Sequence, residues 1–199
     1  MKVNFLEKLF LNNFVWAFIQ RRFIVPVWSK SVDLKSESVV LEAGCGRGAG
    51  SLIIFEEFHP SLIDAFDLDV DMIALAKEHI PKGYSEKINL FVGDVTNIPK
   101  ADSSYDAVFD FFTLYHVEDW QLGLSEISRV IKSGGYFAFM EPYEKTMQNL
   151  IFRNLFDHPS ENRFNREDWL KGLAENGLRI MESKSNIWGK GLIGVATKI

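Results

Sequence analysis

Cysteine is the scarcest residue in this chain of 199 residues, which contains only Cys45. A single cysteine cannot form a disulfide within the chain, so the composition predicts a fold held by its apolar core in the reducing environment of the cytoplasm. The four histidines are scattered along the sequence without the spacing that metal ligands need. We therefore predict no metal site.

Positive charge is also in short supply. Lysine and arginine total 22 against 27 aspartates and glutamates, which gives a net charge of -5 and an isoelectric point of about 5.4. Proteins that bind DNA or RNA use positive surfaces to neutralise phosphates. The composition therefore argues against a nucleic-acid partner.

Long apolar runs are missing as well, although the N-terminal segment is rich in aromatic residues. Polar residues interrupt it before any run reaches the roughly 18 residues that a membrane-spanning helix needs, and no cleavage site of a signal peptide follows. We expect no stable insertion into a membrane. The apolar residues repeat instead at the spacing of one helix face, which we expect to pack on the protein itself, with lipid or a partner as the alternative. They are Phe5, Leu6, Leu9, Phe10, Phe14, Phe18 and Ile19.

From residue 38 onward, strand-like and helix-like runs alternate regularly. This pattern predicts an α/β fold, a Rossmann-like doubly wound sheet with helices on both faces. The last two strands are joined by a connection too short for a helix and should pair antiparallel. We expect about seven strands, mostly parallel with an antiparallel last strand. The predicted strands are 38–44, 61–69, 87–94, 105–112, 135–142, 178–184 and 191–199, with helices at 48–60, 70–81 and 120–135.

Local signals set the limits of two helices. Gly134 is placed to end the helix before the fifth strand in the left-handed conformation. Asn165 can cap a later helix, with Asp168 completing a capping box and Phe164 packing on Trp169 as a hydrophobic staple.

One stretch breaks the alternation between the fifth strand and the capped helix. Insertions at the carboxyl edge of a parallel sheet lie where ligands bind in such folds, so we predict a substrate-side insertion at 143–164. An extra helix that only enlarges the core is the alternative. The residues that suggest a helix here are Met147, Leu150, Ile151 and Leu155.

The most informative stretch is VVLEAGCGRGAGS at 39–51. A strand-to-helix turn this rich in glycine lets its backbone approach a ligand closely. It lacks the Gly-Lys-Ser/Thr of a nucleoside triphosphate loop. Gly44, Gly46 and Ala49 match the G-x-G-x-x-A pattern of dinucleotide-binding folds. Asp67 ends the second strand, where an acid can bind ribose hydroxyls.

Three features argue against a dinucleotide. Glu42 stands two residues before the first glycine, where a pyrophosphate would be repelled and a cationic ligand favoured. Asp94 ends the third strand and offers an acceptor for an exocyclic amine such as that of adenine. The Tyr-x-x-x-Lys spacing of short-chain dehydrogenases is missing from the sequence.

Five motifs in order resemble the class I S-adenosylmethionine-dependent methyltransferases, closest to the small quinone- and sterol-type C-methyltransferases. They are VVLEAGCGRGAGS, AFDLDVDMIALA, FVGDVTNIP, YDAVFDFFTLYHVEDW and ISRVIKSGGYFAFMEP, and the resemblance covers residues 38–199. It implies S-adenosylmethionine as cofactor, S-adenosylhomocysteine as product, and in-line transfer of a methyl group to a small-molecule acceptor. The motifs are specific for the cofactor and nearly silent about the acceptor, which we expect to be apolar or aromatic.

By this resemblance, Glu42 and the glycine loop hold the methionine part of the cofactor. Asp67 would bind the ribose hydroxyls and Asp94 the adenine amine, although both aspartates also suit a helix cap or a turn. Cys45 is expected to fill space in the loop, not to act as a nucleophile. The other implied contacts are Gly44, Cys45, Gly46, Gly48, Leu68, Val95, Asp110 and Phe111.

A general base is needed only when the acceptor must lose a proton. His116 is the first choice because an unperturbed imidazole titrates near neutral pH, and Tyr115 is the second, with Glu118 and Glu141 as further candidates. Nucleic-acid amino-methyltransferases carry Asp/Asn-Pro-Pro-Tyr/Phe after the fourth strand, whereas this chain has DFFT at 110–113. The difference again argues against a nucleic-acid base as acceptor.

Residues 1–37 precede the motifs. In related small methyltransferases this segment folds over the cofactor cleft, so the resemblance predicts a helical lid whose Arg22 binds the cofactor carboxylate. Two other functions stay open at this point: a nicotinamide-dependent oxidoreductase, and a non-catalytic module that binds S-adenosylmethionine. The sequence carries no signal of the oligomeric state.

Overall fold

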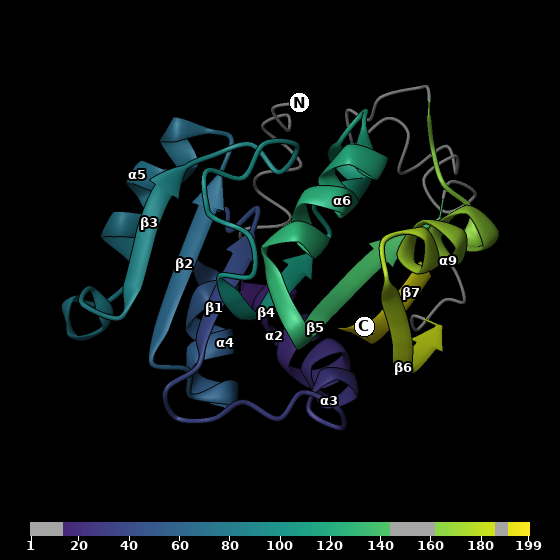
Figure 1. The fold of residues 1–199 in the computed structure, drawn as a ribbon. Coiled ribbons are helices and arrows are strands. Elements are labelled where there is room, and N and C mark those ends of the chain that lie inside the picture. Colours follow the sequence, from purple (N-terminus) through teal and green to yellow (C-terminus); the bar gives the residue numbers. More distant parts are fainter. Residues whose placement is uncertain (1–13, 144–161, 186–190) are drawn as a thin grey trace.

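The computed structural model describes residues 14–143, 162–185 and 191–199. Its centre is a seven-stranded sheet in the order β3-β2-β1-β4-β5-β7-β6 (Figure 1). Strands β1 to β5 run parallel, and β7 is antiparallel to both β5 and β6, which confirms the predicted fold class. The strands are β1 (Val39–Ala43), β2 (Leu62–Asp67), β3 (Ile88–Val92), β4 (Tyr105–Phe111), β5 (Ile131–Pro142), β6 (Leu178–Ser185) and β7 (Gly191–Lys198).

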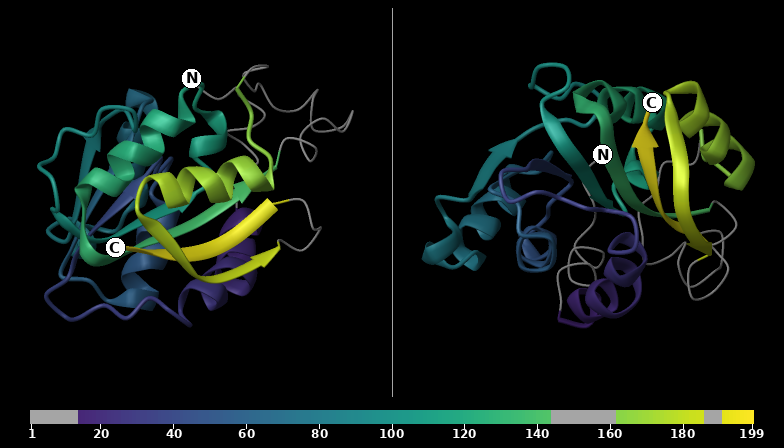
Figure 2. Two further views of the ribbon diagram at one scale, coloured as in Figure 1. Left: turned by 45° about the vertical axis from the view of Figure 1, so that its right-hand side comes forward. Right: turned by 60° about the horizontal axis from the view of Figure 1, so that its bottom comes forward.

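Helices cover both faces of the sheet because the central strands are apolar on both sides. Val40, Leu41 and Ala43 of β1 are all 0% exposed. Figure 2 shows α6 and α9 on one face, and α3, α4 and α5 on the other. These elements are α3 (Val25–Trp28), α4 (Ala49–Phe58), α5 (Val70–His79), α6 (Trp120–Val130) and α9 (Arg166–Glu175), with short 3₁₀ turns η2 (Lys82–Tyr84) and η3 (Leu114–His116).

The strand order reverses at β1. The chain runs outward from β1 through β2 to β3, and then returns to the other side of β1 with β4. The connections that follow β1 and β4 therefore diverge and leave a crevice at the carboxyl ends of these strands. Ligands of doubly wound folds bind at this point.

Helix α9 begins as its sequence predicts. The Asn165 side chain accepts hydrogen bonds from the N–H groups of Glu167 and Asp168, and the Asp168 carboxylate accepts one from the N–H of Asn165. Phe164 stacks on Trp169 with ring centroids 4.9 Å apart. The capping box and the hydrophobic staple are both confirmed.

The end of α6 differs from the prediction. Gly134 has a left-handed φ of 77°, but the helix stops at Val130 and β5 follows directly. Lys198 reaches across from β7, and its ammonium donates to the carbonyl oxygens of Ser128 and Ile131 at 2.7 and 2.8 Å. A cation here satisfies carbonyl groups that the last turn leaves open. The predicted stop at Gly134 is therefore wrong.

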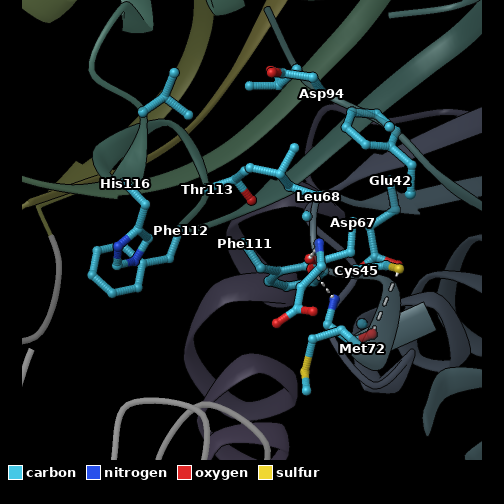
Figure 3. Close-up of a pocket in the computed structure, with 18 of the residues that line it drawn as sticks. Glu42, Cys45, Asp67, Leu68, Met72, Asp94, Phe111, Phe112, Thr113 and His116 are labelled. Carbon is cyan, nitrogen blue, oxygen red and sulfur yellow. Dashed lines mark hydrogen bonds between the residues drawn. The ribbon is translucent and has the colours of Figure 1, made fainter. Parts of the chain in front are cut away.

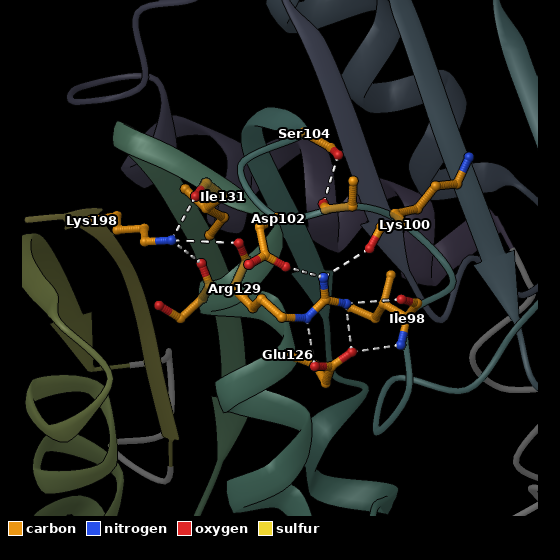
Figure 4. A network of polar contacts seen from close by, with 10 residues as sticks. Ile98, Lys100, Asp102, Ser104, Glu126, Arg129, Ile131 and Lys198 are labelled. Atoms are coloured by element: carbon orange, nitrogen blue, oxygen red, sulfur yellow. Dashed lines mark hydrogen bonds and ion pairs between the residues drawn. The ribbon is translucent and has the colours of Figure 1, made fainter.

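Arg129, in the last turn of α6, organises a polar network beside this helix end (Figure 4). Its guanidinium donates to both carboxylate oxygens of Glu126 at 2.7 Å and to Asp102 at 2.8 Å. It also donates to the carbonyl oxygens of Ile98 and Lys100 at 2.9 and 2.8 Å. Each of its five N–H groups thus has an acceptor, and the connection between β3 and β4 is fixed to α6.

The N-terminal segment is one helical run with a change of pitch. Helix α2 (Phe14–Ile19) passes through the π-helical η1 (Gln20–Ile24) into α3. Pro26 explains the wider turn, because proline has no N–H group and its ring clashes with the carbonyl four residues earlier in a regular helix.

The side chains of this segment that face the protein differ from the predicted stripe. Phe18 is 61% exposed, so the prediction that it belongs to the packed apolar face is wrong. Trp28 is buried instead, with ring centroids 5.6 Å from Phe109 and 4.5 Å from Phe111. The stripe residues before Phe14, and the helix predicted within 143–164, lie outside the described residues.

Candidate functional site

A cavity of about 320 Å³ lies at the carboxyl ends of β1, β2 and β4, where the strand order reverses (Figure 3). Most residues predicted to bind a cofactor line it, and so does the predicted base. These are Glu42, Gly44, Cys45, Gly46, Asp67, Leu68, Asp94, Val95, Phe111 and His116. Gly48, Asp110, Tyr115 and Arg22 lie outside the lining.

The glycine loop carries the chain from β1 into α4. Gly44, Gly46 and Gly48 have left-handed φ values of 65°, 52° and 79°, which residues with side chains rarely adopt. A Cβ at Gly44 would also overlap the Thr113 side chain, whose hydroxyl donates to the carbonyl oxygen of Ala43 at 2.9 Å. The loop therefore presents bare backbone to the cavity.

Glu42 lies almost completely buried at the end of β1. The Ser51 hydroxyl donates a hydrogen bond to its carboxylate, and Gly50 lies so close that a Cβ there would overlap it. Burial raises the pKa of Glu42 to about 8, the hydrogen bond from Ser51 opposes the shift, and the charges of Asp67 and Asp110 add to it. A positive charge beside Glu42 would favour the ionised carboxylate.

Cys45 is fixed in the loop by its backbone N–H, which donates to the carbonyl oxygen of Phe66 at 2.8 Å. Burial raises the pKa of the Cys45 thiol well above its usual range, and the neighbouring carboxylates of Glu42 and Asp67 raise it further. The thiol is therefore neutral and a poor nucleophile, which agrees with the space-filling role expected of it.

Asp67 ends β2 with both carboxylate oxygens held by the backbone. Oδ2 accepts a hydrogen bond from the N–H of Gly46 at 2.9 Å, and Oδ1 accepts one from the N–H of Asp69 at 2.8 Å. The cap of α5 is Asp69, which accepts from the N–H of Asp71 at 3.1 Å. Asp67 is thus oriented at the cavity wall and does not serve as the helix cap.

Asp94 and Leu68 line the cavity from the segments that follow β3 and β2. Asp94 holds a turn, because its Oδ1 accepts from the N–H and the hydroxyl of Thr96 at 2.9 and 2.8 Å. The turn role that aspartate favours is therefore present, and both of these bonds engage one oxygen. Leu68 is 42% exposed and offers an apolar surface at the cavity mouth.

Asp110 and Glu141 are fully buried and hydrogen-bond each other. Asp110 accepts from the N–H of Thr113 at 2.8 Å, while Glu141 accepts from the N–H groups of Leu114 and Tyr115 at 2.8 and 3.1 Å. Burial raises the pKa of Glu141 well above its usual range, and the charge of Asp110 raises it further, so the pair shares a proton. Glu141 lies outside the lining, and its contacts position η3.

The turn held by this pair carries an aromatic wall. Phe112 has a φ of 77°, a strained conformation for a residue with a side chain. Its ring lies beside that of His116 (Figure 3), with centroids 4.8 Å apart, and its centroid is 6.5 Å from that of Trp16. Tyr115 stacks on Phe112 at 5.9 Å and is only 2% exposed, so it lies behind the wall.

Sequence reasoning missed the residues that reach the cavity from the N-terminal segment. They are Trp16 and Gln20, whose spacing of four residues places them on one helix face. Arg22, which was expected there, is exposed and lies over the Phe23 ring at 5.7 Å. The four-residue spacing of Trp16 and Gln20 is visible in the sequence. The neighbouring aromatic residues and arginines, however, favoured a different helix face and Arg22 as the cofactor contact.

The cavity lining is strongly acidic. Among its described residues there is no lysine or arginine, whereas six acidic side chains are present: Glu42, Asp67, Asp69, Asp94, Glu118 and Asp119. Such a lining attracts cations and repels phosphates. Across the described ranges, no group of three or more histidine, cysteine, aspartate and glutamate side chains could hold a metal ion. The helices in this part of the chain include none long and apolar enough to cross a membrane.

Residues 41–139 match a family model described as a methyltransferase domain. A demethylmenaquinone methyltransferase of Bacteroides fragilis is 31% identical over 103 residues, which cover 51% of this chain and 42% of that relative. A fatty-acid O-methyltransferase of Mycolicibacterium smegmatis is 24% identical over 147 residues, which cover 73% of this chain and 46% of that relative. The chain spans about half the length of the curated relatives it matches.

A solved structure with a similar fold is a SAM-dependent methyltransferase from Aquifex aeolicus. The two chains superpose with a TM-score of 0.73 at 17% identity, and the match covers 97% of each. At this identity the likeness establishes the fold alone.

Proposed function

We propose that the chain is a class I S-adenosylmethionine-dependent methyltransferase and that it transfers a methyl group from S-adenosylmethionine to a small-molecule acceptor, which its match to a methyltransferase domain supports. The acidic lining carries the proposal, since its described residues include six acidic side chains and no lysine or arginine. S-adenosylmethionine has a positive sulfonium and a positive ammonium against one carboxylate. A nicotinamide dinucleotide has two negative phosphates. The lining therefore favours S-adenosylmethionine over a nicotinamide dinucleotide and disfavours the oxidoreductase alternative.

The residues present fit this cofactor. Asp67, oriented by two backbone N–H groups, would accept hydrogen bonds from two ribose hydroxyls. Leu68 would lie against the adenine ring, and Asp94 would accept a hydrogen bond from its amine. The methionine end would lie along the bare backbone of the glycine loop, with its ammonium near Glu42.

When bound, the cofactor supplies a methyl group that its sulfonium activates toward nucleophiles. The chain has to align the acceptor and exclude water, and alignment alone accounts for about 7–11 kcal/mol of a barrier in favourable cases. The wall formed by Trp16 and Phe112 suits an apolar or aromatic acceptor. His116 would accept a proton where the acceptor must lose one, because it lines the cavity and Tyr115 does not.

Residues 1–37 would act as a lid in this proposal. Trp16 and Gln20 line the cavity, and Arg21 forms ion pairs with Glu56 and Glu57 on α4. A cytoplasmic location is also part of the proposal and is supported by the single cysteine.

Calorimetric titration of the chain with S-adenosylhomocysteine and with NAD tests the ligand class. We expect saturable binding of the first and no binding of the second. Incubation with methyl-labelled S-adenosylmethionine and a panel of quinols, phenols, fatty acids and amines then tests transfer. Binding of NAD without binding of S-adenosylhomocysteine would overturn the proposal, and binding without transfer to any acceptor would favour a non-catalytic module.

A further inference from the structure

Gln20 brings a buried amide into the cavity from the N-terminal segment. The residue is 3% exposed and belongs to the lining. Its Oε1 accepts no hydrogen bond from any described residue. An unsatisfied buried carbonyl is unfavourable, so a ligand group that donates a hydrogen bond at this place is favoured.

The neighbours of Gln20 along the segment show which part of the cavity it faces. Trp16, one turn earlier, lies 6.5 Å from Phe112, and Trp28, farther along, lies 4.5 Å from Phe111. Gln20 lies between these two contacts on the inner face of the segment. It therefore lies over the carboxyl end of β4.

Strand β4 and strand β2 flank β1 on opposite sides. A cofactor whose ribose is held by Asp67 on β2 has to extend across β1 before it reaches Gln20. The part that arrives there is the amino-acid end, which has an ammonium and a carboxylate. A primary amide offers an acceptor oxygen and a donor nitrogen, which complement these two groups.

We propose that Gln20 binds the amino-acid end of the cofactor, with Oε1 accepting a hydrogen bond from the ammonium. The inference rests on the proposed function and extends it to the N-terminal segment. It gives this segment a direct contact with the ligand through a neutral residue. The neighbouring Arg22, which is exposed, takes no part.

Calorimetry on the full chain with two ligands tests the inference. S-adenosylhomocysteine carries the amino-acid end, and 5′-methylthioadenosine carries the same adenosine and a thioether without it. Gln20→Met removes the amide and retains most of the side-chain volume. We expect its affinity for S-adenosylhomocysteine to fall by about tenfold or more, and its affinity for 5′-methylthioadenosine to change by less than about twofold.

Two further variants complete the test. Arg22→Met, the matched exposed control, should leave both affinities unchanged. Gln20→Glu retains an acceptor oxygen and should bind S-adenosylhomocysteine more tightly than Gln20→Met does, and the reverse order contradicts the inference. Unchanged binding of S-adenosylhomocysteine by Gln20→Met overturns it, and so does an equal loss for both ligands, since a general effect on the fold weakens both. An unaltered chain that binds neither ligand overturns the proposed function as well.

Discussion

The carboxylates at the two ends of the sheet have opposite surroundings. Towards the amino ends of the strands, Asp64 accepts hydrogen bonds from Lys100 and Tyr105, both at 2.6 Å. Burial opposes the ionisation of Asp64, but its hydrogen bonds outweigh burial and lower its pKa. Asp106 on β4 likewise pairs with Lys132 at 2.8 Å, and its pKa is also lowered.

At the carboxyl ends, the buried acids have no such partners among the described ion pairs. Glu42 receives a hydrogen bond from a serine, and Asp110 and Glu141 share a proton. Burial raises the pKa of all three. The paired carboxylates stabilise the fold, whereas Glu42 is ionised at little cost only when a ligand brings positive charge. A cationic ligand is therefore expected at the carboxyl ends of the strands.

The largest effect is expected at Arg129, the partner of two further carboxylates. Arg129→Met removes the donors to Glu126, Asp102 and two carbonyl groups. We expect the free energy of unfolding to fall by about 2–4 kcal/mol in urea titrations, because four part-buried hydrogen bonds of a charged group are lost together. The affinity for S-adenosylhomocysteine should not change.

Lys171→Met is the matched control. It breaks an exposed pair with Glu175 at 3.7 Å and should cost about 0–0.5 kcal/mol. If the Arg129→Met and Lys171→Met variants lose the same stability, the Arg129 network beside α6 stabilises the fold no more than an exposed ion pair does.

Asp64 and Asp67 both lie on β2, so a matched substitution at each compares the two ends of one strand. Asp67→Asn should weaken binding of S-adenosylhomocysteine by about 1.5–3 kcal/mol, since the charge-assisted contact to two ribose hydroxyls is lost. Asp64→Asn should instead lower the free energy of unfolding by about 1–3 kcal/mol and leave binding unchanged. Calorimetry measures binding and urea unfolding measures stability for both variants. If Asp64→Asn lost binding and Asp67→Asn lost only stability, the assignment of a structural role to Asp64 and a ligand-binding role to Asp67 would be contradicted.

Asp94→Asn should have the smallest effect. The expected loss of affinity for S-adenosylhomocysteine is about 1 kcal/mol, because the donor is a neutral amine. Stability should be nearly unchanged, since the amide oxygen can still accept from Thr96. A loss as large as that of Asp67→Asn, measured by the same calorimetry, would mean that the adenine end is placed wrongly.

Much of the fold could be predicted because its signals are local. The alternation of apolar runs gave the order of strands and helices, and Asn165 with Asp168 gave the start of α9. The end of α6 could not be predicted, because it depends on Lys198 from a distant strand. The exposure of Phe18 likewise depends on a tertiary contact, because Trp16 and Gln20 face the cavity and leave Phe18 on the outer side of α2.

The residues of the site could likewise be predicted only in part. Glu42, Asp67 and the glycines were visible because a tight turn and a strand end impose residue types at fixed positions. The requirement for glycine at position 50 could not be predicted, because it arises from the Glu42 carboxylate, which packs where a Cβ would lie. The burial of Asp110 behind the cavity also depends on its pairing with β5, which no local pattern records.

Proton release on binding tests most directly the claim that the ligand supplies the positive charge that Glu42 lacks. With its pKa raised to about 8, Glu42 holds its proton at pH 7 in the free chain. A cation lowers that pKa, so binding should expel the proton, and affinity should rise with pH up to about 8. Titrating S-adenosylmethionine at pH 7 in buffers of different ionisation enthalpy counts the protons. We expect the unaltered chain to release close to one proton more than Glu42→Gln does, and equal proton counts for the two chains would contradict the role assigned to Glu42.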